Sequence, residues 1–472
     1  MKHSTLTLIL TLAGGSGFLS LGHAEPLLLK PGPCLLLDDR FIETSSNVSR
    51  EINRPRRGLD HPIITGREDQ NFQPYISVVR DTTTGRFRMW YGALVKERTR
   101  FGYIESDDGI HWIRPHRILT DPAKITFGNS VIDEGPDFPD PSARYKIAWN
   151  MLKSGQWIAN SPDGFNWTTN KFQPVLPTHL GVNDILALSH DRPRNRYIMI
   201  YGFRSSPEDG YKGKTQNMAY EGYRRCVAQS TSTNCFDWTK PRRIIAPDNQ
   251  DEGITEFYSI GNVIARGDTL IGMLKVLRDD LPCDVNGPTN GIGYTVLAWS
   301  HDGENWQRDR KPFFDRDLTP GTWDHAMTWG DYQLPVNDEV FIYYGGYASG
   351  HKPNRATERQ IGVVRMKRDR YVAREAGKKE GKLQTRLLTL DGGELTLNVD
   401  ASRGVARAQI LDEKGKPLRG FRFADCAPIK SDGLNEPVHW KRPLAELKGK
   451  PVRLEFALLN AKLFAFEIKD TP

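Results

Sequence analysis

A short motif, Ser-x-Asp-Gly-x-x-Trp, recurs along the chain and constrains its fold more than any other feature. The copies read SDDGIHW at residues 106–112, SPDGFNW at 161–167, a degenerate STNCFDW at 232–238 and SHDGENW at 300–306. A recurring motif indicates an architecture of repeated units. The period is too long for a helical solenoid and suits one four-stranded sheet with long loops per repeat. The sequence therefore predicts a β-propeller.

Each copy of the motif predicts a tight turn. The Asp side chain accepts hydrogen bonds from nearby backbone N–H groups, and Gly adopts positive φ at no steric cost. The Trp then lies on the strand that follows. We interpret these residues as structural parts of the turns and not as catalytic groups. The motif resembles the Asp-boxes of sialidases and other propeller proteins, but the arginine triad and Tyr–Glu pair that a sialidase implies cannot be placed in this sequence.

From Pro33 to about Arg374 the sequence is almost entirely β in character. Short runs rich in Val, Ile, Tyr, Trp and Phe alternate with Gly, Asp, Asn and Pro turns. They form five sets of four strands, at residues 75–114, 130–169, 185–240, 258–308 and 326–374. This pattern predicts an all-β chain with a five-bladed β-propeller at residues 33–375. A six-bladed propeller is the competing interpretation, because residues 34–42 precede the first set and offer an extra hairpin.

Two further segments flank this region. Residues 1–24 combine Lys2, an apolar run at 6–21 and a small-residue stretch at 22–24, which together predict a signal peptide. The run is short and contains three glycines, so an uncleaved membrane anchor is less favoured, and we expect a secreted or periplasmic protein. After a polar linker at 376–382, residues 383–470 alternate apolar and polar side chains. They predict a small β-sandwich that serves as a packing or carbohydrate-contacting accessory.

Composition excludes several classes of protein. The 472 residues carry a net charge of +7, with no nucleic-acid-binding or cofactor-binding motif. Five cysteines are too few and too scattered for a disulfide framework, although Cys226 and Cys235 flank a predicted hairpin and are placed to pair. No ligand spacing indicates zinc, and a calcium ion at the propeller axis has no diagnostic ligand string. We therefore expect no metal or cofactor, and the sequence does not indicate an oligomeric state.

Polar residues recur where the first strand of each set begins. In a propeller these strands line the central channel, and their entry loops meet at one mouth. The entries hold an acid in four sets and an amide in the second: Asp69 with Gln73, Asn129, Asp184, Glu256, and Asp324 with His325. Charges that merely face solvent are not expected to recur at the same position of separate repeats. The sequence therefore predicts a ring of polar side chains around the axis.

Carboxylate pairs held across a cleft are what glycoside hydrolysis requires. One must be protonated to release the leaving oxygen, and the other ionised to attack or to activate water. We assign Glu256 as general acid and Asp69 or Asp184 as base or nucleophile. Asp324 and His325 orient or tune these groups, and His325 is a second candidate acid. We expect Gln73, Asn129, Tyr258, Trp323 and Lys275 to bind the sugar; the plainer alternatives are turn-capping acids, packed aromatics and a salt bridge for Lys275.

The segments FRMWYGA, SDDGIHW, YYGGY and TERQIGV resemble secreted, planctomycete-type glycosyl-hydrolase-like proteins. The whole pattern is similar to the five-bladed propeller glycosidases of the arabinanase, levansucrase and invertase superfamily. This resemblance implies hydrolysis of a poly- or oligosaccharide. The WMNDPNG, RDP and EC signatures of the invertase type are absent: Asp69 in REDQNF and Glu256 in TEFYS stand only near the places of the first and last.

Two alternatives use the same channel. A propeller of this form also serves as a non-catalytic carbohydrate-binding or protein-binding module. A polysaccharide lyase needs a Tyr or His base beside a group that neutralises a uronate, and Tyr258, His325 and Lys275 supply those groups. Carboxylates about 5 to 10 Å apart in one pocket favour hydrolysis, whereas acids spread over separate faces favour binding.

Overall fold

The computed structural model describes most of the chain, and nearly all of its regular structure is β. Among the described residues, the helices are α1 (Gly66–Asp69) and six single-turn 3-10 helices. The predicted signal peptide and Gln73 lie outside the described residues. No helix in the described part of the chain is long and apolar enough to cross a bilayer. The structure describes residues 25–69, 75–95, 98–114, 116–120, 124–169, 172–216 and 221–470.

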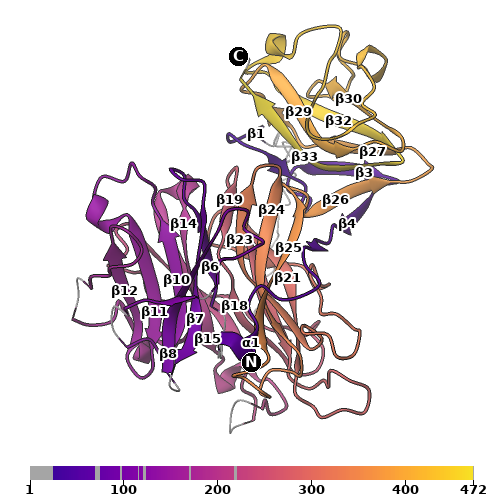
Figure 1. The fold of residues 1–472 in the computed structure, drawn as a ribbon. Coiled ribbons are helices and arrows are strands. Elements are labelled where there is room, and N and C mark those ends of the chain that lie inside the picture. Colours follow the sequence, from indigo (N-terminus) through magenta and orange to yellow (C-terminus); the bar gives the residue numbers. More distant parts are fainter. Residues whose placement is uncertain are drawn as a thin grey trace, which may run out of the picture.

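Three four-stranded antiparallel sheets follow one another along the first half of the chain (Figure 1). In each, the strands pair in the order in which they occur. The first contains β6 (Ser77–Arg80), β7 (Phe87–Val95), β8 (Arg98–Ser106) and β9 (Arg117–Ile118). The second contains β10 (Phe127–Asp133), β11 (Tyr145–Met151), β12 (Gly155–Ser161) and β13 (Leu176–Pro177). The third contains β14 (Val182–Asp191), β15 (Arg196–Arg204), β16 (Arg225–Ser232) and β17 (Arg242–Ile245).

The next two groups of strands are linked into one larger sheet by the single pair Gly293 and Met327. The first group contains β18 (Thr255–Ile260), β19 (Ile264–Arg266), β20 (Thr269–Arg278), β21 (Ile292–Ser300) and β22 (Trp306–Arg308). The second contains β23 (Met327–Val336), β24 (Glu339–Tyr347) and β25 (Arg359–Lys367), with β5 (Arg56–Arg57) as its outer strand.

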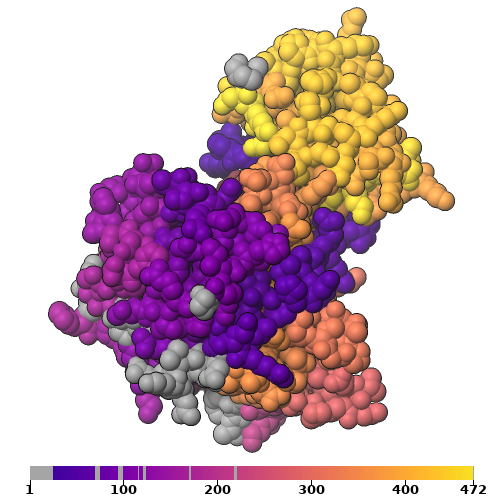
Figure 2. Space-filling view, viewed as in Figure 1, coloured from indigo at the N-terminus to yellow at the C-terminus, as the bar shows by residue number. Residues whose placement is uncertain are grey.

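Two more sheets form the separate upper lobe in Figures 1 and 2, and they combine strands from both ends of the chain. One joins β1 (Leu27–Leu28), β3 (Ile42–Ser46), β27 (Gly381–Thr385), β28 (Leu388–Thr389), β30 (Val405–Leu411) and β32 (Pro451–Leu459). The other joins β2 (Cys34–Leu35), β4 (Ser49–Ile52), β26 (Val372–Ala376), β29 (Glu394–Asp400), β31 (Asp432–Pro437) and β33 (Ala461–Lys469). Their apolar faces share one core.

Strand pairing near residues 34–57 and 370–376 differs from the sequence analysis. Residues 370–374 were expected to be the outer strand of the fifth set, but β26 pairs with β33 and β4 in the upper lobe. The outer place is taken by β5, and β2 and β3 also pair within the upper lobe. The alternation of apolar residues shows that a segment is a strand but not which sheet it joins, and the two-residue β5 has no alternation.

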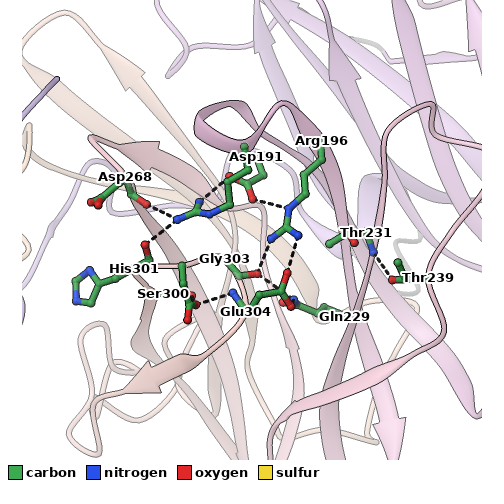
Figure 3. Close-up of polar contacts among 12 residues, drawn as sticks. Asp191, Arg196, Gln229, Thr231, Thr239, Asp268, Ser300, His301, Gly303 and Glu304 are labelled. Carbon is green, nitrogen blue, oxygen red and sulfur yellow. Dashed lines mark hydrogen bonds and ion pairs between the residues drawn. The ribbon is translucent and has the colours of Figure 1, made fainter. Parts of the chain in front are cut away.

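The repeated Ser-x-Asp-Gly turns have the predicted geometry. In the last copy, Asp302 Oδ1 accepts hydrogen bonds from the backbone N–H groups of Glu304 and Asn305 at 2.8 and 2.6 Å. Figure 3 shows that this turn is also held by the neighbouring sheet. Arg196 pairs with Asp191 on its own sheet and donates to the Glu304 carboxylate at 2.6 Å and to the Gly303 carbonyl at 3.0 Å. The turns therefore link adjacent sheets.

The remaining short elements are the 3-10 helices η1 (Pro141–Ala143), η2 (Thr178–Leu180), η3 (Arg192–Arg194), η4 (Pro207–Asp209), η5 (Phe423–Asp425) and η6 (Leu444–Leu447). All five cysteines are free in this structure, so Cys226 and Cys235 are not joined. Both thiols are fully buried. The aromatic second strands supply much of the core, since Trp90, Trp149, Tyr201 and Tyr343 are fully buried.

Candidate functional site

The starts of five strands from five different groups meet at one place. We call this place the axial cluster, defined by Tyr75, Phe127, Ile185, Tyr258, Leu277, Ala326, Met327, Trp329 and Tyr347. These residues come from the beginnings of β6, β10, β14, β18 and β23 and from the ends of β20 and β24. In an antiparallel sheet, second strands end where first strands begin. Both therefore bring side chains to the same mouth.

Glu256 is the second residue of β18, and its side chain is fully buried. Its Oε1 accepts a hydrogen bond from the backbone N–H of Arg225 at 3.0 Å, whereas Oε2 has no hydrogen-bond partner in the described part of the chain. Burial raises the pKa of this carboxyl group to about 7; the charge of Arg225 opposes the rise and that of Asp279 adds to it. A carboxylic acid with this pKa keeps its proton close to neutral pH, as a general acid must.

Arg225 connects Glu256 to Asp184. Its backbone binds Glu256, and its Nη1 donates to Asp184 Oδ1 at 2.8 Å. The guanidinium also lies over the Tyr258 ring, 4.5 Å from the centroid. Burial acts to raise the pKa of Asp184, but the charge and hydrogen bond of Arg225 outweigh it and keep the pKa below its ordinary value. One carboxyl group that retains its proton and one that is ionised thus share a single arginine.

Asp279 is a third buried carboxylate, and the search of first-strand entries missed it. Only 2% of the residue is exposed, and its Oδ1 has no hydrogen-bond partner among the residues described. Burial raises its pKa above the ordinary value. Asp279 directly follows the last residue of β20, and its charge contributes to the raised pKa of Glu256.

Aromatic rings and a buried histidine pack against Tyr258 in this site. Tyr258 packs against Trp329 and His351, with ring centroids 4.7 and 5.0 Å apart. Burial lowers the pKa of His351 well below its usual range, and nearby Arg359 and Lys352 reinforce the shift. The imidazole is therefore neutral. Its Nε2 has no hydrogen-bond partner within the described ranges.

Positive charge accumulates around these groups. Arg224 is buried and donates to the carbonyl oxygens of Gly213 and Tyr223 at 3.1 and 2.7 Å. Burial lowers the pKa of Lys352, and the charges of Arg355 and Arg225 lower it further. In the described part of the chain neither Arg224 nor Lys352 forms an ion pair with an acid. These two cations therefore interact with Asp279 through its charge and without a direct ion pair.

Lys275 and Asn129 also lie deep in this region. Lys275 forms an ion pair with Asp331, whose second oxygen accepts the backbone N–H of Ile76 at 3.1 Å. This is the salt bridge of the plainer interpretation. Asn129 is 2% exposed, and neither atom of its amide group has a hydrogen-bond partner among the residues that are described.

Asp69 and Asp324 are held in closed ion pairs. Asp69 accepts hydrogen bonds from Arg114 and from Tyr91, the latter at 2.6 Å, and lies 2.9 Å from His116 Nδ1. Burial opposes ionisation, but His116, Arg114 and Tyr91 hold the pKa of Asp69 well below its usual range. Asp324 accepts hydrogen bonds from Arg57 at 3.0 Å and Tyr344 at 2.8 Å. None of these partners belongs to the axial cluster.

Trp323 and His325 lie beside Asp324 and have partners of their own. Trp323 stacks on Tyr344 at 5.4 Å and packs so closely over Gly346 that a Cβ there would lie 2.3 Å from its ring. His325 contacts Asp284 through Nε2 and the Asp317 carbonyl through Nδ1. The structure thus brings Glu256, Asp184, Tyr258 and Lys275 together near the axis. It gives Asp69, Asp324, Trp323 and His325 other neighbours, and all the assigned roles stay predictions.

Comparison with known proteins gives structural matches alone. No family model and no curated protein matches the chain. A putative glycoside hydrolase from Bacteroides ovatus has a TM-score of 0.45 and 17% identity, covering 66% of this chain and 96% of that one. A glycoside hydrolase family 43 arabinoxylan arabinofuranohydrolase from Bacillus subtilis has a TM-score of 0.43 and 10% identity, covering 87% and 99%.

A third similar structure is described with the words that the GH130 family of mannoside phosphorylases contains glycoside hydrolases that target β-1,2 mannosidic linkages in Candida mannan. It has a TM-score of 0.43 and 14% identity, covering 67% of this chain and 94% of that one. The descriptions of all three structures name glycoside hydrolases. The function of this chain is argued below from its own residues.

Proposed function

We propose that this protein is an exported glycoside hydrolase whose acid/base pair is Glu256 and Asp184. The observation that carries the proposal is the arrangement around Arg225: its backbone binds a buried Glu256 with a pKa of about 7, and its side chain binds an ionised Asp184. One protonated and one ionised carboxyl group are the two parts that glycoside hydrolysis needs. Asp279, whose charge acts on Glu256, is an alternative partner.

We further infer that the five groups of strands around the axial cluster are the blades of a five-bladed propeller, and that the upper lobe is a β-sandwich accessory. The meeting of five strand starts in one cluster supports the first inference. The core shared by two sheets supports the second. Export is supported by the leader-like pattern of residues 1–24, and N-terminal sequencing of the secreted or periplasmic protein tests it.

A panel of plant and algal glycans tests the enzymatic proposal. We expect the wild-type protein to release reducing sugar from at least one member, and Glu256→Gln to abolish the release. Glu252→Gln is the matched control, because Glu252 lies on the loop that leads into β18, with 86% of its side chain exposed. Unchanged turnover in Glu256→Gln would remove Glu256 as the acid. Retention of a glycan without any product would instead favour the binding module.

A polysaccharide lyase is the second candidate, and Lys352 favours it. A lyase must stabilise the carboxylate of a uronate, and Lys352 is a partly buried cation that forms no ion pair in the described part of the chain. Lyase and hydrolase differ in their products, since elimination leaves a double bond that absorbs ultraviolet light and hydrolysis does not. The same panel, read by absorbance as well as by reducing ends, separates the two.

A further inference from the structure

A second group of reactive side chains lies on two loops beside the axial cluster. Cys283 and Asp284 follow β20, and His325 precedes β23. One possible ligand atom from each residue lies within 4.8 Å of the other two. Cys283 packs against the axial cluster, whereas 52% of the Asp284 side chain is exposed. The group is thus anchored on one side and open to solvent on the other.

The hydrogen bonds of His325 decide which ring nitrogen is available. Nδ1 lies 2.9 Å from the carbonyl oxygen of Asp317. A carbonyl oxygen only accepts, so Nδ1 carries the hydrogen. Nε2, 2.8 Å from Asp284 Oδ1, either carries a second proton or offers its lone pair to a cation. A backbone carbonyl that fixes the far nitrogen is the usual support of a metal-bound histidine.

One arginine holds the two loops together. Arg316 Nη1 donates to the carbonyl oxygens of His325 at 2.9 Å and of Cys283 at 3.3 Å. The Cys283 Sγ lies 3.4 Å from Asp284 Oδ2, so the thiol contacts one oxygen of this carboxylate and the imidazole contacts the other. Zinc–ligand bonds of about 2.0–2.3 Å place neighbouring ligand atoms of a tetrahedron about 3.3 to 3.7 Å apart. Binding of an ion requires side-chain rotations that bring the three atoms, which lie within 4.8 Å of one another, to that spacing.

We propose that Cys283, Asp284 and His325 bind a transition-metal ion, with Zn²⁺ the best match. A thiolate and an imidazole select Zn²⁺ over Ca²⁺ or Mg²⁺, which prefer oxygen ligands. Binding releases the thiol proton to solvent, and three protein ligands leave one tetrahedral position open. The ion cross-links the two loops at the edge of the axial cluster. The sequence shows no ligand spacing typical of zinc, and Asp284 and His325, 41 residues apart, meet only in the folded chain.

The chain contains a matched control for this site. His301 Nε2 lies 2.8 Å from Asp38 Oδ2, the same separation as in the His325–Asp284 pair. The third neighbour there is the indole N–H of Trp299, which donates to Asp38 at 2.7 Å and cannot bind a metal ion. The His–Asp geometry is therefore present at both places, and the thiol at one alone.

Titration of the chelator-treated, full-length protein with Co²⁺ tests the proposal under a reductant that contains no thiol. We expect one equivalent to bind, with the thiolate-to-Co²⁺ charge-transfer band in the near ultraviolet and tetrahedral d–d bands in the visible, and Zn²⁺ to displace it. Cys283→Ser should abolish the charge-transfer band, and His325→Gln should weaken binding by at least about tenfold. His301→Gln should change neither.

Near-ultraviolet circular dichroism of each apo variant establishes that it is folded. Asp284→Asn, at an exposed side chain, replaces His325→Gln if the latter unfolds, and is expected to weaken Co²⁺ binding as well. Absence of the charge-transfer band in the wild type would overturn the proposal. A band that survives Cys283→Ser would also overturn it, because the ion would then be bound by another thiol.

Discussion

Two pairs of acidic residues that the sequence analysis expects near strand entries have different surroundings. Asp69 and Asp324 each accept hydrogen bonds from an arginine and a tyrosine. Glu256 and Asp184 share Arg225, and Glu256 keeps one buried oxygen without a partner among the described residues. The neighbours of such an acid therefore decide whether it is held in an ion pair, as Asp69, Asp184 and Asp324 are, or keeps a buried oxygen without a partner among the described residues, as Glu256 does.

Substitution of Arg225, which binds both Glu256 and Asp184, should have the largest effect on the free energy of unfolding. Arg225→Met leaves the mostly buried Asp184 without its cation, and loss of one partner of a buried ion pair costs about 3–5 kcal/mol. We expect that decrease in the free energy of unfolding, measured by urea denaturation at neutral pH. Arg242→Met is the control, because Arg242 is an exposed member of an ion pair in the same sheet. Equal losses in both variants would contradict the special role of Arg225.

The pH dependence of stability tests the buried state of Glu256. Its folded pKa of about 7 lies above its ordinary value of 4.5, so the folded protein binds this proton more tightly than the unfolded chain does. Its contribution is therefore fully present below pH 4.5 and is lost as the pH rises through 7. The difference corresponds to about 3 kcal/mol.

Urea unfolding of wild type and Glu256→Gln across this pH range gives the measurement, since the amide does not titrate. We expect the wild type to lose stability relative to the variant between pH 4.5 and 7. Parallel profiles would show that Glu256 is ionised at neutral pH, and the assignment as general acid would then fail.

Asp69 gives the contrasting case of an acid held in an ion pair. Asp69→Asn removes the negative charge between Arg114 and His116 but leaves Arg114 partly solvated, so we expect a loss of about 2 kcal/mol. The pKa of Asp69 is held below its usual range, so its stabilising contribution is present at neutral pH and lost as the medium becomes acidic. The variant should therefore differ from wild type at pH 7 and converge with it in acid. A difference that is independent of pH would contradict this account.

The sequence predicted the elements well and their partners poorly. Aromatic second strands and Asp-Gly turns are local signals, and they located most of the strands. Asp279, Lys352 and His351 were missed because they stand where second strands end and third strands begin, which reach the same mouth as the first-strand entries. The pairing of β5 with β25, and of β26 with β4, depends on contacts between distant segments that no local pattern records.

Substitutions in the repeated turn should have the smallest effect on stability. The degenerate copy of the turn provides a comparison within the same chain. Asp302→Ala removes four hydrogen bonds at an exposed turn, from the Ser300 hydroxyl, the backbone of Glu304, and both the backbone and the side-chain amide of Asn305, so we expect a loss of about 1 kcal/mol and unchanged activity. Asp302→Asn should be nearly neutral. The degenerate copy already has Asn234 in this place, and its Oδ1 accepts the two equivalent backbone N–H groups at 2.9 Å. If the asparagine variant were as destabilised as the alanine variant, the charge of Asp302, and not its hydrogen-bond geometry, would be what stabilises the turn.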